Sequence, residues 1–102
     1  MSEVKETAKR RVLGLIDKGR DSLISFLGEY IRFKSINPEI AIEGEETQNE
    51  ECQRWLSDQF DGFGCFQKVD IWHVEKGKPN VIGVVKGDGG GRDLMFYGHS
   101  DV

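Results

Sequence analysis

Apolar residues recur at helical spacing in the first third of the chain, with charged residues between them. Over residues 3–17 they form one stripe, which predicts an amphipathic helix that Gly19 interrupts. Asp21 can serve as the N-cap of a second amphipathic helix. That helix is expected to end near Ser35, because the residue before Pro38 is disfavoured in helical conformation.

A third helix is expected over roughly residues 46–61, after which the pattern changes to that of strands. Cys52, Trp55 and Leu56 lie on one face of this helix, where a cysteine usually acts as a small buried apolar residue. Short runs rich in β-branched and aromatic residues follow, separated by turn-forming residues. The runs are residues 66–74, 80–86 and 93–98, and the glycines that end the helix are Gly62 and Gly64. This order predicts an α/β fold in which helices precede a small sheet.

Length and composition limit the classes of function. A chain of 102 residues is enough for one small domain, and 18 acidic against 14 basic residues give a formal charge of −4, which argues against a nucleic-acid partner. There is no signal peptide pattern and no run near the roughly 18 apolar residues of a membrane span, so a cytoplasmic protein without a membrane partner is expected. Two cysteines do not make a disulfide framework.

The glycine-rich run Gly87–Gly91 has the composition of a phosphate-binding loop but not its context. Such loops open directly into a helix whose N-terminal N–H groups face the phosphate. Here Asp93–Tyr97 follows, and its composition is that of a strand. The run is therefore predicted to be a hairpin turn.

The residues that carry candidate chemistry come directly after this third predicted strand. Its run Leu94–Tyr97 has no polar side chain apart from the tyrosine hydroxyl, which predicts burial on both faces in the middle of a sheet. Ligands of such sheets gather at the carboxyl ends of strands, where Gly98 allows close approach. His99 and Asp101 follow and point the same way in extended chain, so the carboxylate can hold one ring nitrogen while the other binds zinc. A histidine simply satisfied by a neighbouring carboxylate is the competing interpretation.

The segment Phe96–Val102 resembles the Gly-His-x-Asp-Val segment of the zinc metallohydrolases that include acetylornithine deacetylase, succinyl-diaminopimelate desuccinylase, aminoacylase and carboxypeptidase G. Weaker matches precede it in the expected order, so that the resemblance spans about residues 20–102. They are the loop Ser35-Ile36-Asn37-Pro38, the helix segment Trp55-Leu56-x-x-x-Phe60 with Gly62-Phe63-Gly64, and the strand Asn80-Val81-Ile82-Gly83.

The resemblance implies a zinc-exopeptidase-like catalytic domain with a mixed sheet and two zinc ions, with cobalt or manganese as alternatives. It implies that His99 binds one ion and that Asp101 acts in catalysis by orienting His99. The other ligands and the general base follow later in that family, so residues 1–102 are expected to be the truncated N-terminal part of one catalytic domain, without a second domain and inactive alone. The implied substrates are N-acyl amino acids or small peptides, whose amide bonds are hydrolysed, and the implied full-length protein is a homodimer.

Two other interpretations stay open. The chain can be a stand-alone, non-catalytic α/β domain that binds a protein partner through an exposed edge strand or through the face of Trp55 and Phe60. It can also be a thiol hydrolase in which Cys52 or Cys65 acts with His73. No base lies near either cysteine in the sequence, and His73, in the middle of a predicted strand, is expected to be structural.

Overall fold

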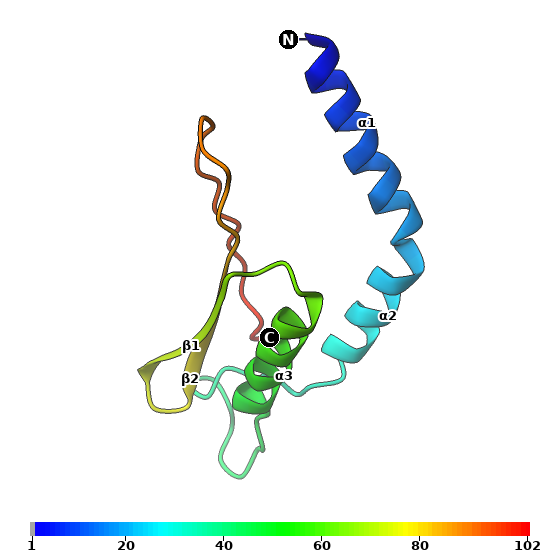
Figure 1. The fold of residues 1–102 in the computed structure, drawn as a ribbon. Coiled ribbons are helices and arrows are strands. Elements are labelled where there is room, and N and C mark those ends of the chain that lie inside the picture. The colour runs from blue at the N-terminus through cyan, green and yellow to red at the C-terminus, as the bar shows by residue number, and fades with distance from the viewer. Residues whose placement is uncertain (1) are drawn as a thin grey trace. The chain divides into compact units, whose positions relative to one another are not determined.

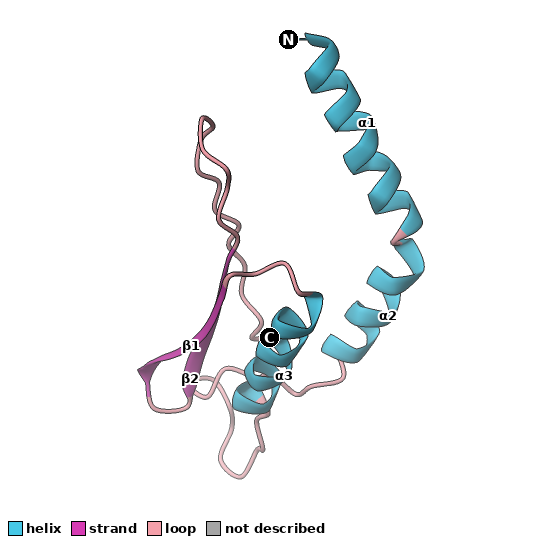
Figure 2. Cartoon of the chain, in the orientation of Figure 1, coloured by secondary structure: helices cyan, strands magenta, loops and turns pink. Residues whose placement is uncertain are grey.

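The structure is a computed structural model that describes residues 2–102. Within these residues the chain forms three helices followed by a two-stranded antiparallel sheet, which is a mixed arrangement of helices and strands (Figures 1 and 2). The chain divides into two compact units, one ending at Arg32 and the other comprising Phe33–Val102. Each unit is described by itself.

The first unit consists of two helices, α1 (Ser2–Lys18) and α2 (Arg20–Tyr30). The predicted helix over residues 3–17 is confirmed. The prediction for Asp21 was wrong, because Gly19 occupies the N-cap position of α2 and Asp21 lies inside its first turn, near the positive end of the helix dipole. No side chain of α1 or α2 is buried.

Helix α2 ends five residues before the predicted end near Ser35. The last turn tightens, because the N–H of Arg32 donates to the carbonyl of Glu29 at 3.3 Å rather than continuing the helical pattern. The chain can then turn away, and the ring of Phe33 packs on that of Trp55 with their centroids 5.6 Å apart. Pro38 indicated only the last position at which helix α2 could end. The contacts of Arg32 and Phe33 determine where the helix does end.

The second unit is built around α3 (Asn49–Phe63). Its predicted existence is confirmed, but it begins three residues later than predicted because Gln48 pairs with Lys34: the N–H of Gln48 donates to the carbonyl of Lys34 at 2.7 Å, and its side-chain oxygen accepts the N–H of Lys34 at 2.9 Å. Gly64 ends the helix with a φ of 72°, a left-handed conformation that favours glycine. Cys52 and Leu56 are the buried apolar residues.

The sheet consists of β1 (Lys68–Glu75) and β2 (Lys78–Val84), which confirms the first two predicted strands. The strands are antiparallel, with Val69 opposite Gly83, and α3 packs against both of them. Phe66, just before β1, stacks on Phe60 of α3 with ring centroids 4.9 Å apart. Gly83 has no Cβ, and this is what allows both rings to lie against β2.

The third predicted strand, over residues 93–98, is not formed. After β2, residues 85–102 contain neither helix nor strand, and the chain runs out to a tip and back (Figure 2). Gly89 and Gly90 have φ values of 97° and 79°, so the turn was predicted in the right place. The expected burial was wrong, since Leu94–Tyr97 are 78–89 % exposed. A strand needs a neighbour to satisfy its backbone, and residues 2–102 supply none beside this run.

Candidate metal-binding site

The segment His99–Val102 is held against the loop that follows α2. The hydroxyl of Ser35 donates to the carbonyl of Ser100 at 2.6 Å, and the N–H of Val102 donates to the carbonyl of Ser35 at 3.0 Å. Ser35 is only 3 % exposed, so both hydrogen bonds are shielded from water at the Ser35 end. Two segments 65 residues apart in sequence are thereby brought into fixed register.

Helix α3 contributes a third hydrogen bond to the same segment. The side-chain N–H of Gln53 donates to the hydroxyl of Ser100 at 2.7 Å. Gln53 lies on the buried face of α3, beside Cys52 and one turn before Leu56. A buried amide must find a partner, and Ser100 supplies it.

His99 and Asp101 are in contact in the structure. Nδ1 of His99 lies 3.0 Å from Oδ1 of Asp101, and the side-chain amide of Asn37 donates to Oδ2 of the same carboxylate at 3.0 Å. The hydrogen bond from Asn37 first, and the contact with His99 after it, hold the pKa of Asp101 below its ordinary value. Asp101 is therefore a carboxylate at neutral pH.

This carboxylate sets the tautomer of His99. An anionic acceptor at Nδ1 favours the form that carries its proton there, which leaves the lone pair on Nε2. Within the described residues Nε2 has no hydrogen-bond partner, and the His99 side chain is 76 % exposed. An imidazole held in this way is suited to bind a metal ion through Nε2.

The described residues can supply one of the ligands that a zinc ion requires. Zinc accepts imidazole nitrogen, and a catalytic ion takes about three protein ligands and a water. Among residues 2–102 no three His, Cys, Asp or Glu side chains converge. His99 is thus a candidate for a single ligand, with Asp101 behind it.

Among the described contacts, those of His73 and of the two cysteines do not involve His99 or Asp101. Nε2 of His73, in β1, is 3.2 Å from a carboxylate oxygen of Glu50 in the first turn of α3, so it links the strand to the helix. Cys52 is fully buried as predicted, and burial raises the pKa of its thiol, which opposes the thiolate that a nucleophile requires. Cys65 is free and exposed.

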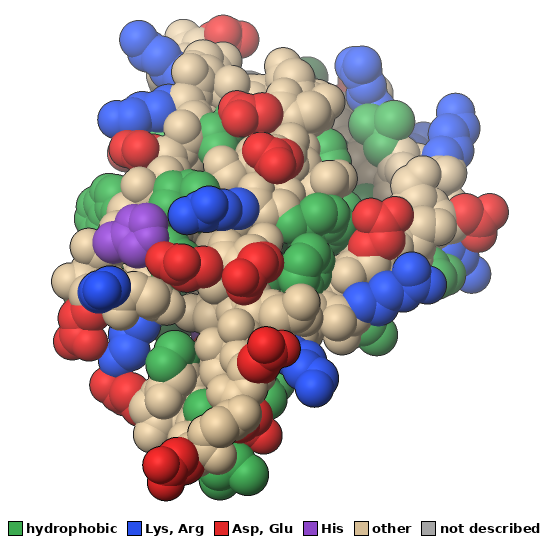
Figure 3. All heavy atoms as spheres, turned by 90° about the horizontal axis from the view of Figure 1, so that it is seen from below, with side chains coloured by type: hydrophobic (Ala, Val, Ile, Leu, Met, Phe, Trp, Pro, Cys, Tyr) green, Lys and Arg blue, Asp and Glu red, His purple; other side chains and the backbone are tan. Residues whose placement is uncertain are grey.

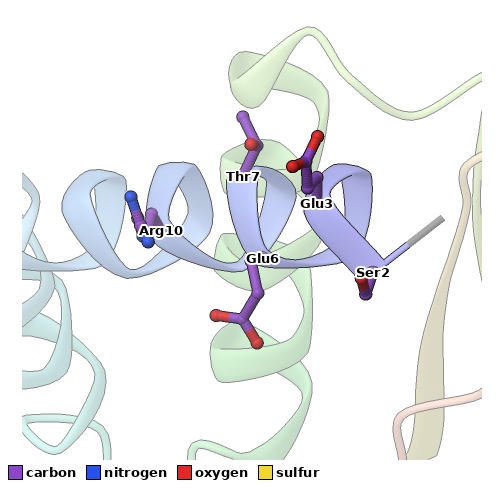
Figure 4. A pocket seen from close by; sticks show the side chains of 5 residues that line it. All are labelled: Ser2, Glu3, Glu6, Thr7 and Arg10. Carbon is purple, nitrogen blue, oxygen red and sulfur yellow. The ribbon is translucent and has the colours of Figure 1, made fainter.

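A shallow hollow on α1 offers no comparable chemistry. Its lining residues all come from the first turns of that helix, and Figure 4 shows their side chains spreading in different directions rather than converging. They are Ser2, Glu3, Glu6, Thr7 and Arg10.

Sequence reasoning missed Asn37 and Gln53 as partners of the motif. Asn37 stood in a loop that the family resemblance had singled out, but nothing in the sequence related that loop to Asp101. One feature of the sequence pointed to Gln53: it is a polar residue next to Cys52, on the apolar face of the predicted helix.

Comparisons of the chain with models of protein families, with curated proteins and with solved structures found no match. In the described part of the chain, no helix combines the length and the apolar character that crossing a membrane requires. On the face shown in Figure 3, acidic and basic side chains are interspersed, with apolar side chains between them.

Proposed function

We propose that the chain belongs to the catalytic domain of a zinc-dependent hydrolase that cleaves amide bonds of N-acyl amino acids or small peptides. One observation carries the proposal: Asp101 holds Nδ1 of His99 at 3.0 Å and leaves Nε2 open. The resemblance of Phe96–Val102 to the acetylornithine deacetylase and aminoacylase group supports it independently, because that motif gives the same two residues the same two roles.

In this proposal the residues of the chain bind and orient rather than transfer protons. His99 donates the Nε2 lone pair, and Asp101 keeps the imidazole in the tautomer that makes this lone pair available. When bound, zinc polarises the scissile carbonyl and lowers the pKa of the attacking water. The mixed sheet of a zinc-exopeptidase-like domain, with the apolar run before His99 as one of its strands, is part of the same proposal.

Replacement of His99 tests the proposal directly. In the intact gene product, His99→Ala is expected to remove bound zinc and the hydrolysis of N-acetyl amino acids together. Asp101→Asn, which keeps the shape of the side chain but removes its charge, should weaken zinc binding by about 10- to 100-fold. His73→Ala is the matched control and should retain both properties. Zinc content and turnover unchanged in His99→Ala would refute the proposal.

A non-catalytic role in binding a protein partner is the second candidate. It is favoured by the exposure of Leu94–Tyr97, an uncharged apolar run whose backbone is free to pair with another strand. Trp55 and Phe60, the other surface predicted for partner binding, pack on Phe33 and Phe66 within the unit. A purified chain that unfolds cooperatively and is indifferent to zinc would favour this candidate over the hydrolase, whereas aggregation or a molten state would oppose it.

A further inference from the structure

Asn37, Asp101 and His99 form a continuous chain of side-chain contacts across two segments of the fold. The amide of Asn37 donates to Oδ2 of Asp101 at 3.0 Å, and Oδ1 of the same carboxylate lies 3.0 Å from Nδ1 of His99. Each carboxylate oxygen therefore has its own partner. Rotation of the Asp101 side chain would break both contacts at once, so an anchor on Oδ2 also fixes the group that faces the imidazole.

Asn37 is itself fixed in one orientation. Its side-chain oxygen accepts the N–H of Glu39 at 3.0 Å, which leaves only the amide nitrogen to face Asp101. Its backbone carbonyl accepts the N–H groups of Ile40 and Ala41 at 3.0 and 3.1 Å. Reversal of the amide would place an oxygen against the carboxylate and a nitrogen against an N–H donor. The turn thus determines which end of the Asn37 side chain points at Asp101.

Hydrogen bonds of Ser35 keep the two segments in register. The two hydrogen bonds of Ser35 to Ser100 and Val102 lie beside the contact between Asn37 and Asp101. By contrast, Asp101 and His99 belong to the same segment, which lies outside any helix or strand. Without Asn37, the carboxylate would have no side-chain anchor outside its own segment among the described contacts.

We propose that Asn37 is a positioning residue for His99, acting through Asp101 to hold the imidazole in the tautomer that presents Nε2. The inference rests on the proposed function, because that function supplies the metal ion that Nε2 of His99 would bind. It adds to that function a residue of a separate loop, which contacts neither the imidazole nor, in this proposal, the ion.

The test uses the intact gene product in metal-free form with ¹⁵N-labelled histidine. Long-range ¹H–¹⁵N spectra, with the His99 signals assigned by the His99→Ala variant, report which ring nitrogen carries the proton. The wild type is expected to show the Nδ1–H form. Asn37→Ala should shift the population toward the Nε2–H form that free histidine prefers. It should also raise the zinc dissociation constant, measured by competition with a chelator, by about tenfold, at the low end of the range for groups behind a ligand.

Asn37→Asp is the sharper variant, and Asn80→Ala is the control. An aspartate at position 37 retains the oxygen that accepts the N–H of Glu39 but replaces the donor to Asp101 by a second carboxylate, so it should give the same shift even if Asn37→Ala fails to fold. Asn80 is exposed in β2, and its replacement should change neither readout. A folded Asn37→Asp protein with the wild-type tautomer and a zinc affinity within twofold of wild type would overturn the inference. Zinc retained by His99→Ala overturns the proposed function instead, because the tautomer is measured without metal.

Discussion

Gly83→Ala is expected to destabilise the second unit, because the position has no room for a methyl group. A Cβ at Gly83 would lie 2.6 Å from Cε1 and 2.7 Å from Cδ1 of Phe66, and 3.1 Å from Cδ2 of Phe60. Real Cβ atoms essentially never approach other heavy atoms below 3.0 Å, so the ring of Phe66 must move. That ring is stacked on Phe60, and its movement separates one of the contacts between α3 and the segment that leads into β1.

The magnitude follows from three contributions. Overpacking costs about 1–3 kcal/mol, and the separated aromatic pair forfeits about 0.5–1.5 kcal/mol. Alanine restricts the unfolded chain and returns about 0.4–1 kcal/mol. The expected net loss is about 2 kcal/mol, which for a unit of this size lowers Tm by roughly 10 °C.

Urea unfolding of the purified protein, followed by circular dichroism, measures this loss. Gly62→Ala is the matched control, because a Cβ there meets nothing within 4 Å and alanine is favoured over glycine in a helix, so stability should rise by up to about 1 kcal/mol. In a Phe66→Ala background the obstructing ring is absent, and Gly83→Ala should cost little. Equal stability of Gly83→Ala and wild type, or an undiminished penalty in the Phe66→Ala background, would refute the steric argument.

Two further predictions concern ionisable groups. Since the folded-state pKa of Asp101 is depressed, the stability that it contributes is present above its unfolded pKa, near 4, and is lost as the pH falls below that value through the folded pKa. Acid titration of metal-free protein should therefore show a smaller loss of stability in Asn37→Ala than in wild type, and identical profiles would contradict this. A thiol reagent should label Cys65 rapidly and Cys52 only after denaturation; rapid labelling of two thiols per native chain would show that the core around Cys52 is open.

The local elements of the fold were predictable where a local signal decides them. Helix α1, the existence of α3 and the two strands β1 and β2 follow from apolar spacing and turn residues, and Gly64 ends α3 with a φ of 72°, as its position after the apolar stripe predicts. The third strand was not predictable in this way. Its composition favours a strand, but formation depends on a neighbouring strand, and composition carries no information about pairing.

The candidate site was predictable in part, for a related reason. The spacing of His99 and Asp101 placed the two side chains within reach of each other, since neighbours two residues apart are constrained by the chain itself. The anchor supplied by Asn37 depends on a contact across 64 residues, which no local pattern encodes. Gly83 is similar: the sequence shows a glycine in a strand, and only the positions of Phe60 and Phe66 explain it.

The hydrogen bonds that Ser35 makes with Ser100 and Val102 also lead us to expect an order of events in folding. Because they close a loop of 65 residues, we expect these contacts to form after helix α3 and the hairpin, which are assembled from nearby residues. The imidazole of His99 is therefore expected to be held in place only at the end of the process. Substitutions at this junction should act mainly by accelerating unfolding, with little effect on the rate at which the rest of the unit is built.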